Sequence, residues 1–277
     1  MEYHGPGLAS LAVMDRHVIA NMGAELGATT TVFPTDEAVL EFLRAQDRAS
    51  DFKELVADPD SVYDVAEEID LSALEPLIAC PSTPDNVVPV REVAGTEVRQ
   101  VVIGSSANPG LRDFAVAAAM VRGRQTHDAV SFDVNPTSRE ILADLTKMGA
   151  TLDLVSAGAR LHQAGCLGCI GMGQAPAAGH NSLRTFPRNF PGRSGTREDR
   201  VWLCSPATAT AAALTGVITD PRELSMGYPS VALPGRATVN TAMLVPPLPP
   251  ERAAREELVK GPNISSLPDF PPLPDDI

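Results

Sequence analysis

The first eighty residues place apolar positions at helical spacing, with turns and acidic stretches between them. Apolar residues recur in this way over 11–26, and Gly27 stands where that helix would end. The next apolar run follows a residue that can cap a helix, either Thr35 or Asp36, which predicts a second helix. Residues 51–79 are acidic and of mixed character, and we expect a helix and loops there.

From residue 98 onwards, short apolar runs alternate with longer amphipathic ones. The short runs at 98–103, 129–134 and 151–155 predict strands, and the longer runs at 111–121 and 138–148 predict helices. Strands that alternate with helices indicate a parallel sheet covered by helices, so we expect an α/β fold.

The loops that follow the predicted strands are where we expect the chemistry. Ligands of parallel sheets bind beyond the carboxyl ends of the strands. The loops in question are 104–110, 135–138 and 156–175. Ligand-binding residues are therefore expected in these three segments.

Composition and charge exclude several partners. The chain carries 35 acidic and 22 basic residues, a net charge of −13, so it offers no overall positive field to nucleic acid or to an anionic membrane. No apolar stretch is long enough to cross a bilayer, and the N-terminus lacks the character of a signal peptide. Four cysteines are too few for a disulfide scaffold. Together these features predict a cytoplasmic protein, in which a local basic pocket for a small anion stays possible.

The C-terminal stretch, residues 246–277, differs in composition from the rest. It holds nine of the 25 prolines in the chain. Such a segment predicts an extended connector or a tail that lies along a surface.

The densest chemical signal is a Cys-x-x-Cys pair, Cys166 and Cys169, inside a run of glycines. Two thiolates at this spacing can reach one metal or one cluster, and small neighbours let the backbone approach it. A redox dithiol, a structural zinc site, an iron–sulfur site and two buried structural thiols all remain open. The glycine-rich surroundings favour the iron–sulfur site. A zinc site usually needs a second Cys-x-x-Cys pair, and a redox pair usually opens a helix, so both of these are less favoured.

Arginines are concentrated in the loop 186–197, which also contains Gly, Pro and Phe. Guanidinium groups at this density can bind carboxylates or phosphates, although a solvated basic loop has the same composition. Asn21 and Glu25 lie four residues apart on a predicted helix and therefore face the same way. They line either a cleft or a solvated helix face.

Several short segments occur together in one order along residues 1 to about 230. They are EYHGPG, NMGAELGATT and VFP near the N-terminus, CLGCIG and RNFPGR in the middle, and SP and TDP after them. In this order they resemble the aconitase superfamily of iron–sulfur dehydratases, and single-chain bacterial aconitases most of all. The proline-rich tail is similar to the connector that leads to the last, swivelling domain of those enzymes.

The resemblance implies a [4Fe–4S] cluster held by three cysteines, with one iron left open as a Lewis acid. Cys166 and Cys169 would be two of its ligands. The implied reaction is the interconversion of citrate and isocitrate through cis-aconitate, a hydro-lyase step of the tricarboxylic acid cycle. The implied alternatives are a 3-isopropylmalate or homoaconitate dehydratase subunit and a non-catalytic polycarboxylate-binding fragment.

The resemblance also assigns roles around the cluster. Arg188 and Arg193 would bind the carboxylates of a small tri- or dicarboxylate. Asn21 would contribute to substrate binding, and Glu25 would line the cluster side of the cleft. Gln174 would be a further neighbour of the cluster.

The chain departs from the family pattern at the first cluster cysteine. The family has Gly-Ser-Cys-Thr-Asn after a strand, whereas this chain has Gly-Ser-Ser-Ala-Asn, with Ser106 at the cysteine position and Asn108 at the end of the motif. Either Ser106 is an oxygen ligand, or Cys80 supplies the third thiolate, or the cluster is held differently. The expectation favours Cys80, because it precedes a proline turn on the cleft side.

The resemblance further implies three-layer α/β/α domains with mostly parallel sheets. We expect the remainder of a second domain over 1–87, a third domain over 88–245 and the connector over 246–277. The resemblance also implies that the catalytic acid and base belong to domains outside these residues, so the isolated chain is expected to be incomplete or inactive. A complementary chain would carry the missing domains.

Overall fold

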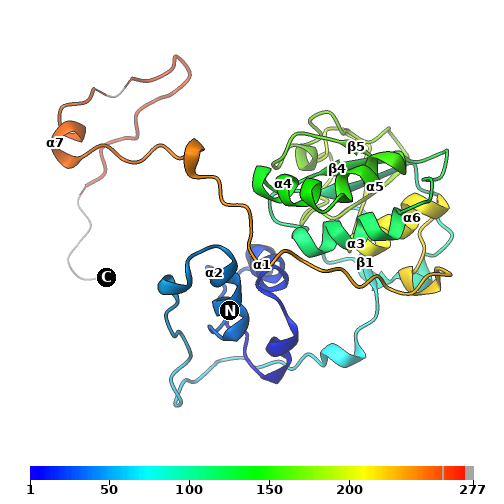
Figure 1. Cartoon of the computed structure of the whole chain (residues 1–277), viewed down its shortest axis with the longest axis horizontal. Helices are drawn as coiled ribbons and strands as arrows, with labels where there is room; N and C mark the ends of the chain where they lie inside the picture. The colour runs from blue at the N-terminus through cyan, green and yellow to red at the C-terminus, as the bar shows by residue number, and fades with distance from the viewer. Residues whose placement is uncertain (258, 272–277) are drawn as a thin grey trace. The chain divides into compact units, whose positions relative to one another are not determined.

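The computed structural model describes residues 1–257 and 259–271, so part of the predicted connector, residues 258 and 272–277, lies outside the described residues. The chain forms two units, Met1–Val239 and Asn240–Ile277. In the described part of the smaller unit, the regular elements are η8 (Thr241–Met243) and the short helix α7 (Pro250–Ala253), visible in Figure 1.

The N-terminal segment contains two α-helices. The predicted helix over 11–26 is confirmed in two pieces, α1 (Val13–Asn21) and the 3₁₀ turn η2 (Gly23–Leu26), and Gly27 ends it in the left-handed conformation. Asp36 caps the second helix, α2 (Glu37–Ala45), because its carboxylate accepts a hydrogen bond from the backbone of Val39. Two further 3₁₀ turns are η1 (Pro6–Ser10) and η3 (Ala49–Asp51).

A buried arginine joins these two helices. Arg16 on α1 makes a bidentate ion pair with Asp36, with Nη1–Oδ1 at 3.1 Å and Nη2–Oδ2 at 2.5 Å. The same guanidinium donates to the backbone carbonyls of Leu8, Leu11 and Pro34. The hydrogen bonds from Arg16 outweigh burial and lower the pKa of the Asp36 carboxyl. One side chain therefore fixes the entry of α1 and the start of α2 together.

The helix expected within 51–79 is wrong. The regular elements there are the 3₁₀ turn η4 (Leu71–Ala73) and the first strand of the sheet. Apolar side chains in this stretch stay in solvent, with Val62 93% and Val65 76% exposed. Acidic residues interrupt the apolar ones at irregular intervals, so no helix face could be buried against the rest of the protein.

Seven strands form one mixed sheet in the order β2-β1-β7-β6-β3-β4-β5. They are β1 (Leu77–Ala79), β2 (Val87–Pro89), β3 (Gln100–Gly104), β4 (Ser131–Asn135), β5 (Arg160–Leu161), β6 (Asn181–Arg184) and β7 (Arg200–Cys204). The last five run parallel, and β1 pairs antiparallel with both β2 and β7. The expected α/β fold with a mostly parallel sheet is confirmed. β1 and β2 belong to this sheet, although β1 precedes the domain boundary expected at 87/88 and β2 spans it. That domain boundary stays a prediction.

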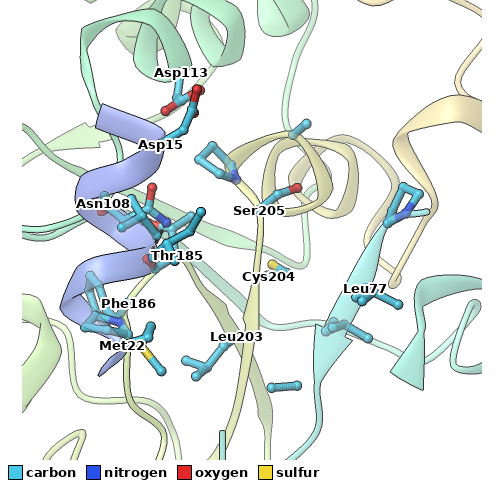
Figure 2. A pocket seen from close by; sticks show the side chains of 18 of the residues that line it. Asp15, Met22, Leu77, Asn108, Asp113, Thr185, Phe186, Leu203, Cys204 and Ser205 are labelled. Atoms are coloured by element: carbon cyan, nitrogen blue, oxygen red, sulfur yellow. Dashed lines mark hydrogen bonds between the residues drawn. The ribbon is translucent and has the colours of Figure 1, made fainter. Parts of the chain in front are cut away.

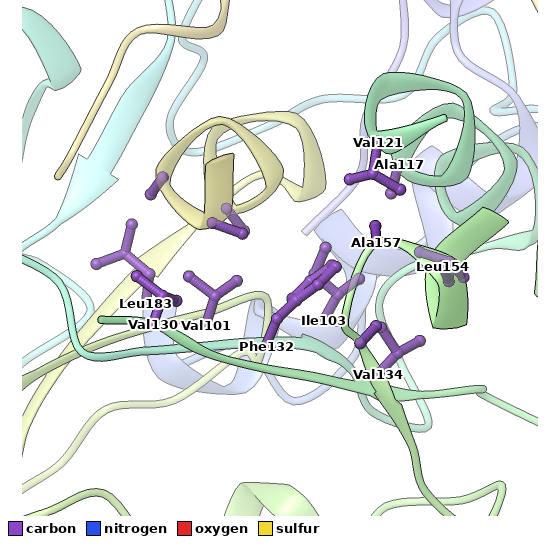
Figure 3. Packing of buried hydrophobic residues seen from close by; sticks show 14 of the residues in the cluster. Val101, Ile103, Ala117, Val121, Val130, Phe132, Val134, Leu154, Ala157 and Leu183 are labelled. Carbon is purple, nitrogen blue, oxygen red and sulfur yellow. The ribbon is translucent and has the colours of Figure 1, made fainter. Parts of the chain in front are cut away.

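Four helices contribute buried residues to an apolar core on one face of the sheet. They are α3 (Leu111–Val121), α4 (Arg139–Lys147), α5 (Ala150–Ser156) and α6 (Pro206–Thr215), with η5 (Val90–Glu92) and η7 (Pro221–Glu223) at the edges. Figure 3 shows part of this core, with Phe132, Val121 and Leu154 among its residues. Strand residues with alternate spacing, such as Val101, Ile103 and Phe132, point into this apolar core. The two strongest helix predictions, 111–121 and 138–148, are confirmed there, and Ser138 caps the second of them.

The opposite face of the sheet is polar although it is buried. Gln100, Asp133, Ser182 and Arg184 alternate with the core residues of the same strands, and all four are buried. The segment that carries the cysteines covers this face, with its single 3₁₀ turn η6 (Gly168–Ile170). A polar sheet face can be buried only where its groups find hydrogen-bond partners, so this face constrains what lies above it.

The strand predicted over 151–155 is wrong, because that segment is helix α5. Ala150 and Leu154 are buried, whereas Leu152 is 70% and Val155 is 51% exposed, which is helical rather than alternate spacing. The actual strand, β5, follows the helix at Arg160–Leu161. A short run of branched apolar residues satisfied both patterns, and only packing on α3 and α4 decided between them.

In the part of the chain that the structure describes, no helix is both long and apolar enough to cross a membrane.

The helical assignment of 151–155 can be tested with two leucines of the same helix. Replacing the buried Leu154 with Ala leaves a cavity in the core and should lower the free energy of unfolding by about 2–5 kcal/mol. Replacing the exposed Leu152 with Ala should change it by less than about 0.5 kcal/mol. Urea unfolding of both variants checks this, and equal losses would contradict the helical register.

Candidate functional site

The Cys-x-x-Cys pair lies beyond the carboxyl ends of the parallel strands, on the polar face of the sheet. The Sγ atoms of Cys166 and Cys169 are 2.8 Å apart. Cys166 is exposed, and Cys169 is buried against Val102 and Phe186. One thiol therefore anchors the loop in the protein, and the other faces outwards.

Glycines let the cysteine loop pack tightly on its neighbours. A Cβ at Gly168 would lie 2.0 Å from Oε1 of Gln174. Gly171 has a φ of +82°, and a Cβ there would lie 2.2 Å from the backbone oxygen of Ser194. The backbone of the cysteine loop thus touches the backbone of the arginine loop, and a side chain at Gly171 would separate them.

Ser106 faces the exposed thiol. Burial opposes ionisation of Cys166, but hydrogen bonds from Cys169 and from the backbone and side chain of Ser106, together with the charge of Arg193, lower the pKa of this thiol. Burial and the neighbouring Cys166 raise the pKa of Cys169 to about 11. The pair therefore contains one thiol that ionises readily and one that does not.

The arginine loop places Arg193 close enough to the cysteine pair for its charge to act on both thiols. Asp199 shapes this loop, because its carboxylate accepts hydrogen bonds from the backbone N–H groups of Gly192 at 3.3 Å and Ser194 at 3.4 Å. The charge of Arg193 acts on Cys166 and on Cys169 alike. Its Nε atom is buried and has no hydrogen-bond partner among the described residues.

The second arginine of the loop reaches the N-terminal segment. Nε of Arg188 donates to Oε1 of Glu25, and both side chains are mostly buried. Asn189, also buried, donates from Nδ2 to the backbone oxygen of Cys80 at 2.9 Å and of Val201 at 3.0 Å. The arginine loop is consequently tied to η2 on one side, and to β7 and the residue that follows β1 on the other.

Buried polar atoms without partners collect in these same segments. Within the described residues, the unpartnered atoms include Asn21 Oδ1, Glu25 Oε2, Arg193 Nε and both polar atoms of Gln174 and of Asn135. Each unsatisfied buried group costs on the order of 1–3 kcal/mol, so several of them in one region indicate a site built for a polar or charged ligand. Asn21, Glu25, Arg193 and Gln174 were all singled out by the sequence, whereas Asn135 was not.

The loop 104–110 is held at the end of β3 by its own side chains. The hydroxyl of Ser105 accepts hydrogen bonds from the backbone N–H groups of Ala107 and Asn108, each at 3.2 Å. Asn108 donates from Nδ2 to the backbone oxygen of Thr185 at 2.9 Å. Asn108 therefore fixes the loop that carries Ser106, and its amide nitrogen is engaged in the hydrogen bond to the backbone of Thr185.

The structure does not bring Cys80 to the cysteine pair. Across residues 1–257 and 259–271, no three His, Cys, Asp or Glu side chains gather closely enough to hold a metal ion. Cys80 contributes its backbone oxygen to Asn189, and burial raises the pKa of its thiol. Among the described residues Cys80 therefore forms no three-ligand group with the pair, and both Cys80 and Ser106 stay predictions for the third ligand.

The donor set of this site fits an iron–sulfur cluster with two thiolates and one hydroxyl. Two cysteines lie side by side, Ser106 faces one of them, and glycine backbone surrounds both. A zinc site would need a third and a fourth strong ligand, which the described residues do not supply here. A cluster also accounts for the cationic Arg193 beside the thiols, because thiolate-bound clusters are anionic.

A separate cavity of about 940 Å³ opens between α1, the β1–β7 edge of the sheet and the start of α6. Figure 2 shows α1 along one wall and Leu203, Cys204 and Ser205 along another. Asn21 and Asn108 line it, but the cysteine pair, Arg188 and Arg193 do not. This cavity therefore adjoins the cysteine site without containing its thiols.

Sequence reasoning missed the buried polar residues that hold the site. Arg184, Asn189, Asp199 and Asn135 are each less than a tenth exposed and lie in or beside strands. A signal that could have found one of them is the arginine inside the short run Ser-Leu-Arg-Thr-Phe, for which no strand was expected from the sequence.

Two glycines of the cysteine loop test the contact between the loops. Gly171 and Gly173 both have positive φ angles, but only a Cβ at Gly171 would meet another backbone. Gly171→Ala should therefore lower the free energy of unfolding by about 2 kcal/mol more than Gly173→Ala. Equal losses in urea unfolding would show that the loops do not touch.

Thiol alkylation tests the role of Ser106. With metal removed, iodoacetamide should modify Cys166 before Cys169. Ser106→Ala should move the pH of half-maximal modification of Cys166 upwards, because the thiolate loses the hydrogen bond from the Ser106 side chain and keeps only the one from the backbone. Ser156→Ala, at an exposed helix end, is the matched control. An unchanged pH profile in Ser106→Ala would contradict the contact.

Comparison with known proteins connects this site to a family. A profile of the aconitase family (aconitate hydratase) matches residues 1–97 and 91–216. The 3-isopropylmalate dehydratase large subunit 1 of Methanopyrus kandleri is 43% identical over 224 residues, which are 80% of this chain and 53% of that protein. The protein of the same name from Thermotoga maritima is 40% identical over 80% of this chain and 54% of its own length.

A third relative, the probable methanogen homoaconitase large subunit of Methanosarcina mazei, is 39% identical over 81% of this chain and 56% of its own length. The chain spans about half the length of the curated relatives that it matches. Both segments of the family profile lie within the larger unit, and together they include α1, the cysteine loop and the arginine loop. The chain belongs to the aconitase family.

Proposed function

We propose that this chain is the cluster-bearing part of a hydro-lyase that acts on a small malate-type dicarboxylate such as 3-isopropylmalate. The observation that carries the proposal is the cysteine pair with Ser106 and Arg193 beside it. The expectation of citrate and isocitrate yields to its alternative, because the relatives named above are dehydratase and homoaconitase large subunits. For the same reason, the proposal includes neither a role in the tricarboxylic acid cycle nor a particular similarity to single-chain aconitases.

Cys166 and Cys169 would hold a [4Fe–4S] cluster, and Ser106 is the nearest candidate for a third ligand. When bound, such a cluster supplies a Lewis-acidic iron that polarises a substrate hydroxyl and carboxylate. The protein's own contribution is to bind and orient the substrate. Arg193, whose Nε is unpartnered, is free to bind a carboxylate at the cysteine pair. Glu25 holds Arg188 in place, and the free amide oxygen of Asn21 can accept a hydrogen bond.

The remaining parts of the reaction would come from elsewhere. The relatives are large subunits about twice as long as the matched segment, so a complementary chain with the catalytic acid and base is part of the proposal. A second function, binding of a polycarboxylate without turnover, is favoured by one observation, the serine at the third ligand position. The two functions differ in whether ligand binding needs iron.

Cluster assembly tests the first function. Anaerobic reconstitution with iron and sulfide should give a brown protein with broad visible absorbance, and Cys166→Ser should abolish it. Ser106→Cys should retain the cluster longer in air than the wild type, because a thiolate replaces a weaker oxygen ligand. Cys204→Ala, which removes a buried core thiol away from the pair, is the control and should keep full iron and sulfide. Iron and sulfide at background in the wild type would refute the cluster.

Calorimetry separates the enzyme from the binding module. Titration of the reconstituted protein with 3-isopropylmalate and with citrate should show tighter binding of 3-isopropylmalate, and the heat should vanish when iron is removed. Arg193→Gln should weaken binding about 10–100-fold, the equivalent of one charge-assisted hydrogen bond of about 1.5–3 kcal/mol. Arg197→Gln, at an exposed position of the same loop, should leave it unchanged. Saturable binding without iron would favour the module.

A further inference from the structure

Arg184 is the largest fully buried side chain of the protein segment that the structure describes, with an exposed fraction of 0%. It lies at the end of β6 on the polar face of the sheet, beneath the cysteine loop. None of the roles proposed above for the site uses it. A buried guanidinium needs both hydrogen-bond acceptors and a compensating negative charge.

Every nitrogen of the Arg184 guanidinium donates at least one hydrogen bond, and these bonds join two parts of the site. Nη1 donates to the backbone oxygen of Gly168 at 2.8 Å, and Nη2 donates to that of Gln174 at 2.5 Å. These two carbonyls flank Cys169 in the chain, so the guanidinium spans the cysteine loop. On its other edge, Nε donates to Ser182 Oγ and Nη2 to Gln100 Oε1, both at 2.9 Å.

The two anchors on the sheet are themselves connected. Ser182 donates to Gln100 Oε1 at 2.8 Å, and Nε2 of Gln100 donates to the backbone oxygen of Gln174 at 3.3 Å. The guanidinium also lies over the ring of Phe186, 5.4 Å from its centre. Arg184 is thus held in one orientation, with its planar fork aimed at the cysteine loop.

Among the described residues, by contrast, no negatively charged side chain forms an ion pair with Arg184. Within the described residues no carboxylate oxygen lies within 4.0 Å of Arg184, and all its acceptors are neutral. Burial lowers the pKa of Arg184 to about 10, and the charges of Asp199, Asp133 and Cys169 only partly oppose this. Of these three, Cys169 lies in the loop that the guanidinium clamps.

We propose that Arg184 is a positioning residue and the internal counter-cation of the anionic group held by Cys166 and Cys169. Its hydrogen bonds fix the carbonyls on both sides of Cys169, and its charge is compensated by the thiolate-bound cluster above it. This inference rests on the proposed function for the identity of the group. The clamp on the loop rests on the hydrogen bonds alone.

Two substitutions separate the charge from the clamp. Arg184→Lys keeps a positive charge but cannot reach four acceptors in one plane, whereas Arg184→Gln keeps polar contacts and removes the charge. Arg200→Gln, which removes an exposed arginine at the start of β7, is the matched control. Each variant is made in the full chain and reconstituted anaerobically, and its reduction potential is measured by redox titration followed by electron paramagnetic resonance.

The account expects a more negative potential and faster loss of iron in Arg184→Gln, because a buried positive charge favours the reduced, more anionic cluster. Arg184→Lys should keep a potential near that of the wild type. The control should match the wild type in both measurements. An unchanged potential in Arg184→Gln, with the cluster present, would overturn the counter-cation.

Hydrogen exchange tests the clamp without the cluster. In cluster-free protein, amides of residues 166–174 should exchange faster in both Arg184 variants than in the wild type, while α3 stays protected, which also shows that the variants fold. Unchanged exchange in that loop in Arg184→Lys would overturn the clamp. If the wild type takes up no iron and sulfide, the proposed function fails, and the exchange result alone decides the role of Arg184.

Discussion

The hydrogen bonds between the polar face of the sheet and the cysteine loop are the constraint on which the site depends. Gln100, Ser182 and Arg184 are buried, so each must be satisfied by something that covers the sheet. The backbone oxygens of Gly168 and Gln174 meet that need, and in doing so they fix the loop that presents the thiols. The apolar face of the same strands packs on four helices and makes the fold stable. The apolar face of the sheet therefore stabilises the fold, and its polar face positions the loop that carries the thiols.

The rest of the site is assembled by ties between loops that are distant in the chain. Glycine at 171 lets the cysteine loop touch the arginine loop, and Asp199 holds the latter in shape. Arg188 then reaches Glu25, which brings the N-terminal segment to the site. Positive charge, free amide groups and an exposed thiol converge as a result. Such a set suits an anionic, carboxylate-bearing substrate next to a metal-containing group.

The sequence predicted well where a local pattern had only one solution. The helix at 111–121 and the capping role of Asp36 follow from periodicity and side-chain chemistry and are confirmed. It failed at 151–155, where a short branched run fits either a strand or a helix and only tertiary packing decides. Family motifs located Cys166 and Arg193, but Arg184 and Asn135 could not be found, because burial of a polar strand residue depends on what covers the sheet.

The central claim is that Cys166 and Cys169 hold an inorganic cluster whose accessible side faces Arg193. A crystal structure of the anaerobically reconstituted chain, with an anomalous map recorded at the iron edge, tests it most directly. The account predicts iron density bonded to both sulfur atoms, with the Ser106 oxygen within bonding distance and the Arg193 guanidinium on the open side. Iron density elsewhere in the chain, or a reconstituted protein whose two thiols carry no iron, would contradict it.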